Sequence, residues 1–363
     1  MNGCYSVVKE STYNIPTNPF VWNGKDNSIS AMILKIPCFL LLLLAGSTSL
    51  RAQETQLDAA DKIRLVEAFE LSRQMGDSVW DGWSQIPFTV LLITENAEFL
   101  FNHPNPTDDF QDLGYDSELQ TNVYVRPSSG GFSPSFLATF PAINGQNTVV
   151  MGQPAATGKT STYWVITALH EHFHQLQFSS PDYWNKVSAL DLTGGDTTGM
   201  WMLNFPYPYD SPGVVSAYEA YENALTAAVS DPVLPAFRLL EAARVQLRSS
   251  VSEKEARYQA FQLWQEGVAR YTEMLVAQWA GESFTPSQAF ASLPDYVSYV
   301  EAYQTLTDSN LKQLAGHSMA RIGRVAFYAA GATEAYLLDF QNSAWKQSYF
   351  DDMPSLEAHT VKF

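Results

Sequence analysis

The pattern of this chain changes near residue 160, and no other feature of the sequence constrains its fold as strongly. Between residues 88 and 151, short runs of branched and aromatic residues are separated by Gly, Pro and Asn, which is typical of strands and turns. From Thr160 onward, apolar residues recur at helical spacing. The sequence therefore predicts an α+β protein with a mostly antiparallel sheet in its N-terminal half and an all-helical C-terminal half. We expect strands at Phe88–Thr94, Ala97–Asn102, Asn122–Arg126, Leu137–Phe140 and Thr148–Met151, a long loop at Asp191–Pro212, and helices at Gln56–Met75, Thr160–Phe178, Val214–Val229, Pro235–Ser249, Glu253–Ala280 and Gly316–Phe340.

The helix expected at 160–178 contains His170-Glu171-His172-Phe173-His174, which has the form H-E-x-x-H. Positions i and i+4 share one face of a helix, so His170 and His174 can hold one zinc ion. Glu171 is then placed to act as general base on water. His172 falls off this face, and we expect it behind the ligands or at the surface. The alternative is that the two outer histidines are an ordinary core or surface pair.

A catalytic zinc site usually has three protein ligands and one open position. Glu266 is the best candidate for the third ligand, because it lies in a segment of helical pattern that begins at Leu263. The neighbouring Gly267 would let this helix approach the zinc helix closely. A solvated glutamate paired with a cation one turn later is the alternative. The reserve ligand candidates are Glu273, Glu219 and Glu222.

Together the two segments resemble the gluzincin metallopeptidases, the thermolysin and aminopeptidase N group. The first motif matches fully at 170–174, and W-x-E-G-x-A-x-Y-x-E is matched at Glu266, Gly267, Ala269, Tyr271 and Glu273. The resemblance covers both helices closely and the order of sheet and helices loosely. It implies a zincin-like fold, one zinc ion held by His170, His174 and Glu266, and a peptide or protein substrate in a divergent bacterial member of the group.

The chain also departs from these relatives. There are 91 residues between His174 and Glu266, far more than in the two relatives, and Arg270 stands where thermolysin-like proteins have an aspartate. The glycine-rich motif of aminopeptidases is not visible before the zinc helix, so aminopeptidase activity is not implied. The carboxylate that orients a zinc histidine must come from elsewhere. The candidates are Glu273, Asp191 and Asp196.

The reaction that the resemblance implies is attack by water. Zinc would polarise the carbonyl and lower the pKa of water toward ~7, and Glu171 would carry the proton to the leaving amine. In the family a Tyr or His downstream of the third ligand donates to the oxyanion. Tyr328 and His317 are the candidates here, with Arg324 behind them, and one helix could present both on one face. An ordinary packed aromatic is the alternative for Tyr328.

The N-terminus indicates export. We expect residues 1–31 to be an upstream extension and residues 32–52 to be a signal peptide, starting at Met32, whose apolar run Ile36–Gly46 is too short to span a bilayer. A buried strand or a retained anchor is the alternative. Both cysteines precede residue 53, so the mature chain has none, which suits a secreted or periplasmic bacterial protein.

The charge of the chain excludes some partners. Its formal net charge is −17, and after residue 52 it keeps 38 − 2 = 36 acidic and 21 − 4 = 17 basic side chains. Such a surface repels nucleic acid and anionic membranes, so we expect neither as a partner, and no stable membrane anchor after signal cleavage. The length fits a sheet-bearing subdomain at 53–180 and a helical subdomain at 181–363 that carries the third ligand.

The sequence thus predicts an exported zinc-dependent metallohydrolase, with a peptidase as the leading interpretation. A zinc hydrolase of a non-peptide substrate would use the same water activation and is the first alternative. A non-catalytic binding protein that retains the fold is the second. The sequence leaves the natural substrate and the oligomeric state open.

Overall fold

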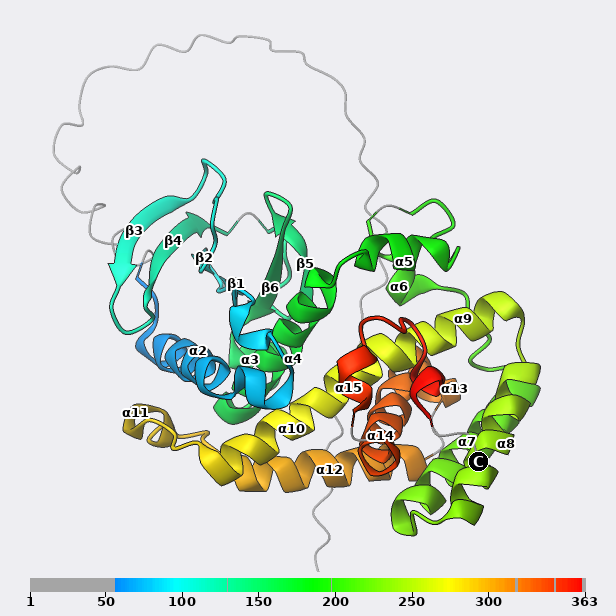
Figure 1. The fold of residues 1–363 in the computed structure, drawn as a ribbon. Coiled ribbons are helices and arrows are strands. Elements are labelled where there is room, and N and C mark those ends of the chain that lie inside the picture. Colours follow the sequence, from blue (N-terminus) through cyan, green and yellow to red (C-terminus); the bar gives the residue numbers. More distant parts are fainter. Residues whose placement is uncertain (1–55, 129, 197, 317–318, 343, 361–363) are drawn as a thin grey trace, which may run out of the picture. The chain divides into compact units, whose positions relative to one another are not determined.

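The protein is described here by a computed structural model that covers residues 56–360, except 129, 197, 317–318 and 343. These residues belong to one compact unit of mixed α+β architecture (Figure 1). The expected extension (1–31) and signal peptide (32–52) lie outside the described residues. Within the described part, no helix is both long and apolar enough to cross a membrane.

The N-terminal half forms one six-stranded sheet with the strand order β3-β4-β2-β1-β6-β5. Strand β1 pairs with β6 in parallel, and the other four pairings are antiparallel. The mostly antiparallel sheet that the sequence predicts is therefore confirmed. The strands are β1 (Val90–Ile93), β2 (Ala97–Phe101), β3 (Gln111–Asp116), β4 (Thr121–Pro127), β5 (Leu137–Ile143) and β6 (Gln146–Gly152).

Each of the five expected strands is present, but β3 was not expected. This strand lies at one edge of the sheet, and its residues are exposed except Asp116, which is half-buried. It contains Gly114 at φ 89°, where its register against β4 shifts. An edge strand without a buried face has no alternation of apolar and polar residues, so its sequence carries no strand signal.

From residue 154 onward the chain is helical, as expected. The long helix α2 (Ala59–Val79) precedes the sheet, and α4 (Ser161–Ser179) follows it. Both helices pack on the same side of the sheet (Figure 1). The remaining helical elements are η1 (Trp83–Gln85), α3 (Pro154–Thr157), α5 (Tyr183–Ala189), α6 (Trp201–Asn204), α7 (Pro212–Ser230), α8 (Leu234–Ser249), α9 (Glu253–Gln262), η2 (Leu263–Gly267), α10 (Val268–Ser283), α11 (Gln288–Ala291), α12 (Tyr299–Ala315), α13 (Met319–Ile322), η3 (Gly323–Val325), α14 (Ala326–Gln341), α15 (Trp345–Ser348) and η4 (Leu356–His359).

Two expectations for the helices are wrong. The single helix expected at 316–340 is interrupted, because Gly323 takes a left-handed conformation at φ 57° and α14 begins only at Ala326. The loop expected at 191–212 contains the short helix α6. Helix α12 was not expected, since many of its surface positions are polar and its buried face is narrow.

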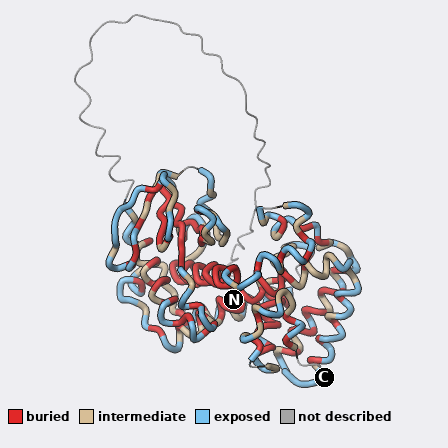
Figure 2. The backbone as a smooth tube through the Cα atoms, turned by 45° about the horizontal axis from the view of Figure 1, so that its top comes forward, coloured by how far each residue is buried: buried red, intermediate tan, exposed pale blue. Residues whose placement is uncertain are grey.

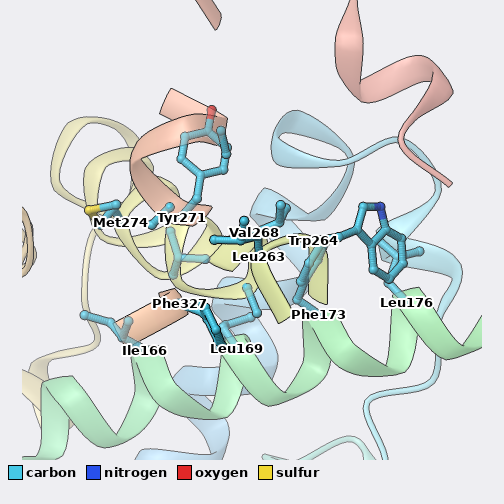
Figure 3. Close-up of a cluster of buried hydrophobic side chains, with 14 of the residues drawn as sticks. Ile166, Leu169, Phe173, Leu176, Leu263, Trp264, Val268, Tyr271, Met274 and Phe327 are labelled. Atoms are coloured by element: carbon cyan, nitrogen blue, oxygen red, sulfur yellow. The ribbon is translucent and has the colours of Figure 1, made fainter. Parts of the chain in front are cut away.

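The core is continuous from the sheet into the helices. Every residue of α4 from Trp164 to Phe178 is buried, as expected of a helix enclosed on all sides. Figure 2 shows buried segments running through the middle of the unit, with exposed segments around them. Helix α10 packs against both α2 and α4. In Figure 3, Leu169 and Phe173 of α4 face Trp264 and Val268, so α4 and the η2–α10 segment share one apolar layer.

Candidate metal centre

Helix α4 places its two outer histidines on one face. The ring centroids of His170 and His174 are 4.9 Å apart and the rings are nearly perpendicular, at 80°. The helix is fixed at its N-terminus by a remote carboxylate: Asp295 accepts hydrogen bonds from the backbone N–H and the hydroxyl of Ser161, at 2.8 and 2.6 Å. A negative charge at this end is favourable because it faces the unsatisfied N–H groups of the first turn.

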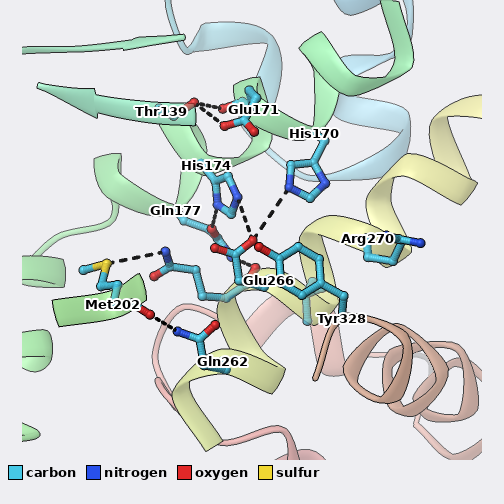
Figure 4. A network of polar contacts seen from close by, with 12 residues as sticks. Thr139, His170, Glu171, His174, Gln177, Met202, Gln262, Glu266, Arg270 and Tyr328 are labelled. Carbon is cyan, nitrogen blue, oxygen red and sulfur yellow. Dashed lines mark hydrogen bonds and ion pairs between the residues drawn. The ribbon is translucent and has the colours of Figure 1, made fainter. Parts of the chain in front are cut away.

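Glu266 approaches the histidines from the opposite side. Its Oε2 lies 3.6 Å from Nε2 of His174 and 3.9 Å from Nε2 of His170 (Figure 4). One ligand atom from each of the three residues can be chosen so that all lie within 4.8 Å of one another. The structure therefore brings together the two histidines and the glutamate that the sequence singles out. Because each side chain is a common zinc ligand, the set could hold a metal ion.

Glu266 lies in the π-helical turn η2, between α9 and α10. Such turns are rare and occur often at functional sites, because the extra residue shifts the side chains that follow. The adjacent Gly267 does allow a close approach, but to α14 and not to α4, the partner expected from the sequence. A Cβ added at Gly267 would lie 2.4 Å from the Cα of Gly331, and one added at Gly331 would lie 2.4 Å from the carbonyl oxygen of Leu263. The close packing is therefore between η2 and α14.

His174 is held in one tautomer by Gln177. The amide nitrogen of Gln177 donates to the backbone oxygen of Gln265 at 3.0 Å and to the hydroxyl of Tyr349 at 2.7 Å. Its Oε1 therefore faces His174 and accepts from Nδ1 at 2.6 Å. With its proton on Nδ1, a neutral His174 presents the lone pair of Nε2 toward Glu266. Sequence reasoning missed Gln177, although a glutamine in a fully buried helix one turn after a ligand is a usable signal.

The carboxylate nearest Nδ1 of His170 belongs to Glu273, at 3.5 Å. Glu273 is buried and also pairs with Nε of Arg270 at 3.3 Å. Nδ1 of His170 is buried, and no described residue gives it a hydrogen bond. Of the three carboxylates proposed to orient a histidine, Glu273 is thus the one that the structure brings to the site.

Asp191 and Asp196, the other two carboxylates proposed to orient a histidine, lie in the loop after α5. Both oxygens of Asp196 accept bonds inside their own loop, from the backbone N–H groups of Thr198 and Trp201 at 2.7 and 2.6 Å. Asp191 is exposed, with φ at 53°. Within the described residues neither aspartate forms an ion pair with His170 or His174, so the structure does not bring them to the histidines as it brings Glu273. Turn formation explains Asp196.

Glu171 is buried beside the site and is bound by the sheet. Its carboxylate Oε2 and its backbone oxygen both accept from the hydroxyl of Thr139 on β5, at 2.9 and 2.8 Å (Figure 4). The neighbouring His172 points into the core, where its ring stacks on Phe88 with centroids 4.1 Å apart and burial lowers its pKa to about 3. It is therefore not at the surface, contrary to one of the two expectations.

Tyr328, on the first turn of α14, lies beside His170 and Glu266 (Figure 4). The two rings are parallel within 8°, with centroids 6.5 Å apart. The hydroxyl of Tyr328 accepts a bond of 2.7 Å from Arg324, which also lies 3.9 Å from Oε1 of Glu266. Because an arginine only donates, the proton of the phenol points away from it. Burial raises the pKa of Tyr328, and Glu266 adds to this effect, so the hydroxyl stays protonated. His317 lies outside the described residues.

Charges in the cluster act on one another strongly. Burial acts to lower the pKa of His174, but the carboxylate of Glu266 outweighs it and raises the pKa to about 9. Burial acts to raise the pKa of Glu266, but His174 outweighs it and holds the pKa well below its ordinary value. Burial lowers the pKa of His170, although Glu273 opposes this. In the metal-free protein the glutamate is therefore ionised beside a protonated histidine, which a metal would deprotonate on binding.

The spacing of the three side chains suits a metal ion better than direct contact. Ligand atoms around a tetrahedral zinc ion lie about 3.3 Å apart, given metal–ligand distances of about 2.0–2.1 Å. The two distances from Glu266 to the histidines, 3.6 and 3.9 Å, are close to this value and too long for good hydrogen bonds. The donor set, two imidazoles and one carboxylate, is typical of catalytic zinc. The chain was compared with protein-family models, with curated proteins and with solved structures, and none gave a significant match.

Proposed function

We propose that this chain is an exported zinc-dependent metallohydrolase of the gluzincin type that hydrolyses peptide bonds. The observation that carries the proposal is the convergence of His170, His174 and Glu266 within 4.8 Å, on two elements separated by 91 residues of sequence. The H-E-x-x-H motif and the second motif at 264–273 support it, as does the sheet that precedes the helices. The zincin-like fold and the export are parts of this proposal.

The proposed chemistry divides the work among named side chains. Zinc bound by His170, His174 and Glu266 would polarise the scissile carbonyl and acidify water at the open position. Glu171, one residue from a ligand, takes a proton from the attacking water and returns it to the leaving amine. The hydroxyl of Tyr328, with its proton directed away from Arg324, donates to the oxyanion.

The supporting side chains fit these roles. Gln177 fixes the tautomer of His174, and Glu273 faces the other nitrogen of His170. Partners behind zinc ligands orient the ring and raise its basicity. Both supports come from helices, α4 and α10, that are packed in the core, and rigid elements hold a site more accurately than loops do.

The test is metal loading followed by activity. We expect one zinc ion per chain by elemental analysis of zinc-loaded, dialysed protein, and cleavage of a mixed-sequence fluorogenic peptide library. Glu171→Gln should keep the zinc and lose about 10²–10⁴ in rate. Glu282→Gln, an exposed change on α10, is the matched control and should keep both.

Three outcomes separate the alternatives. Cleavage of the library that depends on Glu171 supports the peptidase. Stoichiometric zinc without peptide cleavage, together with Glu171-dependent hydrolysis of esters or other small amides, would identify a hydrolase of non-peptide substrates. Protein that binds no zinc contradicts both enzyme proposals and leaves a binding protein of the same fold.

A further inference from the structure

We propose that Thr139 is a positioning residue that fixes the carboxylate of Glu171 in one orientation toward the metal centre. Its kinetic consequence rests on the proposed function, whereas its structural consequence does not. Thr139 lies on β5, and its hydroxyl reaches both the backbone oxygen and Oε2 of Glu171, at 2.8 and 2.9 Å (Figure 4). Neither motif in the sequence contains this threonine.

The two contacts tie the side chain of Glu171 to its own backbone. A hydroxyl has one hydrogen to donate, which Thr139 shares between two oxygens of the same residue. The backbone oxygen is fixed by helix α4, and Thr139 is fixed by its pairing with Val149 of β6. The position of Oε2 is therefore set by the packing of the sheet against α4. The other carboxylate oxygen is left for the proton transfer.

A glutamate needs such a restraint more than most bases do. Its side chain has three rotatable bonds, and the terminal one has a broad, shallow preference. Proton transfer requires a heavy-atom distance of about 2.6–3.2 Å from base to water, so a rotated carboxylate loses much of its rate. Glu171 is only 6% exposed, so few water molecules can replace the hydroxyl of Thr139 as a donor.

Thr139 lies within the regularly paired part of β5, one residue before that part ends. The pairing of β5 with β6 is regular from Leu137 to Phe140, and its register shifts before Ile143. Leu137 and Thr139 are two residues apart and so share the face toward α4, where Leu137 packs on the core. The regular pairing of β5 thus directs the hydroxyl of Thr139 toward α4. The shift in register comes after Thr139 and does not change this direction.

The structural test compares zinc-loaded crystals of the wild type, Thr139→Val and Thr139→Ser. Valine keeps the shape of threonine and removes the hydroxyl, and serine keeps the hydroxyl. We expect the wild type and Thr139→Ser to show one conformer of the Glu171 carboxylate, with Oε2 within hydrogen-bond distance of residue 139. Thr139→Val should show a rotated or split carboxylate. An unchanged single conformer in Thr139→Val would overturn the inference. If valine prevents folding, Thr139→Ala serves in its place.

The kinetic test uses the peptide that the library identifies. We expect Thr139→Val to lower kcat by about tenfold to a hundredfold with KM and zinc content unchanged, because binding does not involve the base. Thr139→Ser should restore most of the rate. Thr148→Val is the matched control, since its hydroxyl bonds the backbone oxygen of Gln146 and its loss leaves Glu171 untouched. Equal kcat in Thr139→Val and Thr148→Val would contradict the inference.

The two proposals fail in different ways. A wild type that cleaves no peptide contradicts the proposed function, and the orientation of Glu171 in the crystals still decides the role of Thr139. A wild type that is active, with an equally active Thr139→Val, contradicts only the role of Thr139. A raised KM with unchanged kcat in Thr139→Val would assign the threonine to substrate binding and would also overturn the inference.

Discussion

Two glutamates in the helical half of the molecule, the buried Glu334 and the half-buried Glu266, meet their partners at different distances. Glu334, on α14, accepts from the hydroxyl of Tyr221 at 2.6 Å and from Nε of Arg244 at 2.7 Å. Glu266, in η2, faces Nε2 of His174 at 3.6 Å and a second histidine nitrogen at 3.9 Å. The first cluster is closed by hydrogen bonds, whereas the second keeps its atoms apart at about the spacing of metal ligands.

The comparison shows what separates a structural ion pair from a candidate metal centre. Around Glu334, flexible side chains on α7 and α8 reach the carboxylate and satisfy it. Around Glu266, the packing of the backbone keeps the carboxylate and the two histidines from moving into direct contact. The histidines belong to a helix that is buried on all sides, and η2 is fixed against Gly331. Rigid elements thus hold the ligand atoms apart, as a binding site requires.

The largest effect on stability should come from the closed cluster. Glu334→Ala leaves the half-buried guanidinium of Arg244 without its carboxylate. We therefore expect a loss of about 3 kcal/mol in the free energy of unfolding, measured by urea denaturation, which is the lower end of the cost of breaking a buried pair. Replacing both partners, with Glu334→Leu and Arg244→Met, should recover most of that loss, because no charge then stays unpaired. A single variant within about 1 kcal/mol of the wild type would show that the pair contributes little.

Substitutions in the cluster of His170, His174 and Glu266 should instead lower the affinity for zinc. Glu266→Ala removes a ligand, and we expect zinc affinity to fall by more than about a hundredfold, beyond the loss of 10–100-fold typical of a partner behind a ligand. A hundredfold loss corresponds to about 2.7 kcal/mol. Competition with a chromophoric chelator measures it, and Glu334→Gln serves as the control with unchanged affinity. Equal affinities of Glu266→Ala and the wild type would place the metal elsewhere.

The next largest effect should come from a substitution where η2 and α14 approach closely. A methyl group at residue 331 would lie 2.4 Å from the carbonyl oxygen of Leu263, so Gly331→Ala forces the two segments apart. We expect a loss of about 1–3 kcal/mol in stability and a weaker affinity for zinc, since Glu266 moves with η2. Gly213→Ala on α7 is the matched control, because a methyl group there meets open space. Thermal unfolding with and without zinc measures both effects. Equal unfolding temperatures for Gly331→Ala and Gly213→Ala under both conditions would contradict this account.

Glu67 on α2 is another buried glutamate, with no cation among its contacts in the described residues. Burial raises its pKa to about 7, although the backbone N–H of Ser287, at 3.2 Å, opposes this. The folded state then binds a proton more tightly than the unfolded state, whose pKa is 4.5. Stability should therefore fall as the pH rises from about 4.5 to about 7 and change little above that range.

Glu67→Gln removes this titration. At pH 8 we expect the variant to be more stable than the wild type by about 1 kcal/mol, after allowance for solvent screening. Below pH 4.5 the two proteins should be equally stable. Urea denaturation across this range, with a chelator present to remove metal, measures the difference. A wild type and variant with parallel profiles would show that Glu67 does not titrate in this range.

What the sequence predicts and what it misses have physical causes. The pairing of His170 with His174 is readable because it depends only on the helical repeat, which is local. Glu266 is readable through its motif, and its position next to the histidines follows from packing that no local pattern encodes. Thr139 was missed because it reaches the site through a tertiary contact. Gln177 contacts His174 within one helix, so it was missed although its signal is local.

The break before α14 and the packing of Gly267 against Gly331 also depend on tertiary structure. A single glycine such as Gly323 can adopt either a helical or a left-handed conformation, and its sequence context does not show which. The sequence therefore predicted one helix over residues 316–340. The exposed edge strand β3 could not be predicted for a related reason. Without a buried face, a strand leaves no periodic trace in its sequence.

The central claim is that His170, His174 and Glu266 hold one zinc ion. A crystal structure of the zinc-loaded protein, with anomalous data collected at the zinc absorption edge, tests it most directly. We predict one strong peak between the three side chains, with Nε2 of each histidine at about 2.0–2.1 Å and a carboxylate oxygen of Glu266 at about 2.0–2.2 Å from the metal. No peak at this position, or a metal bound without Glu266, would contradict the account.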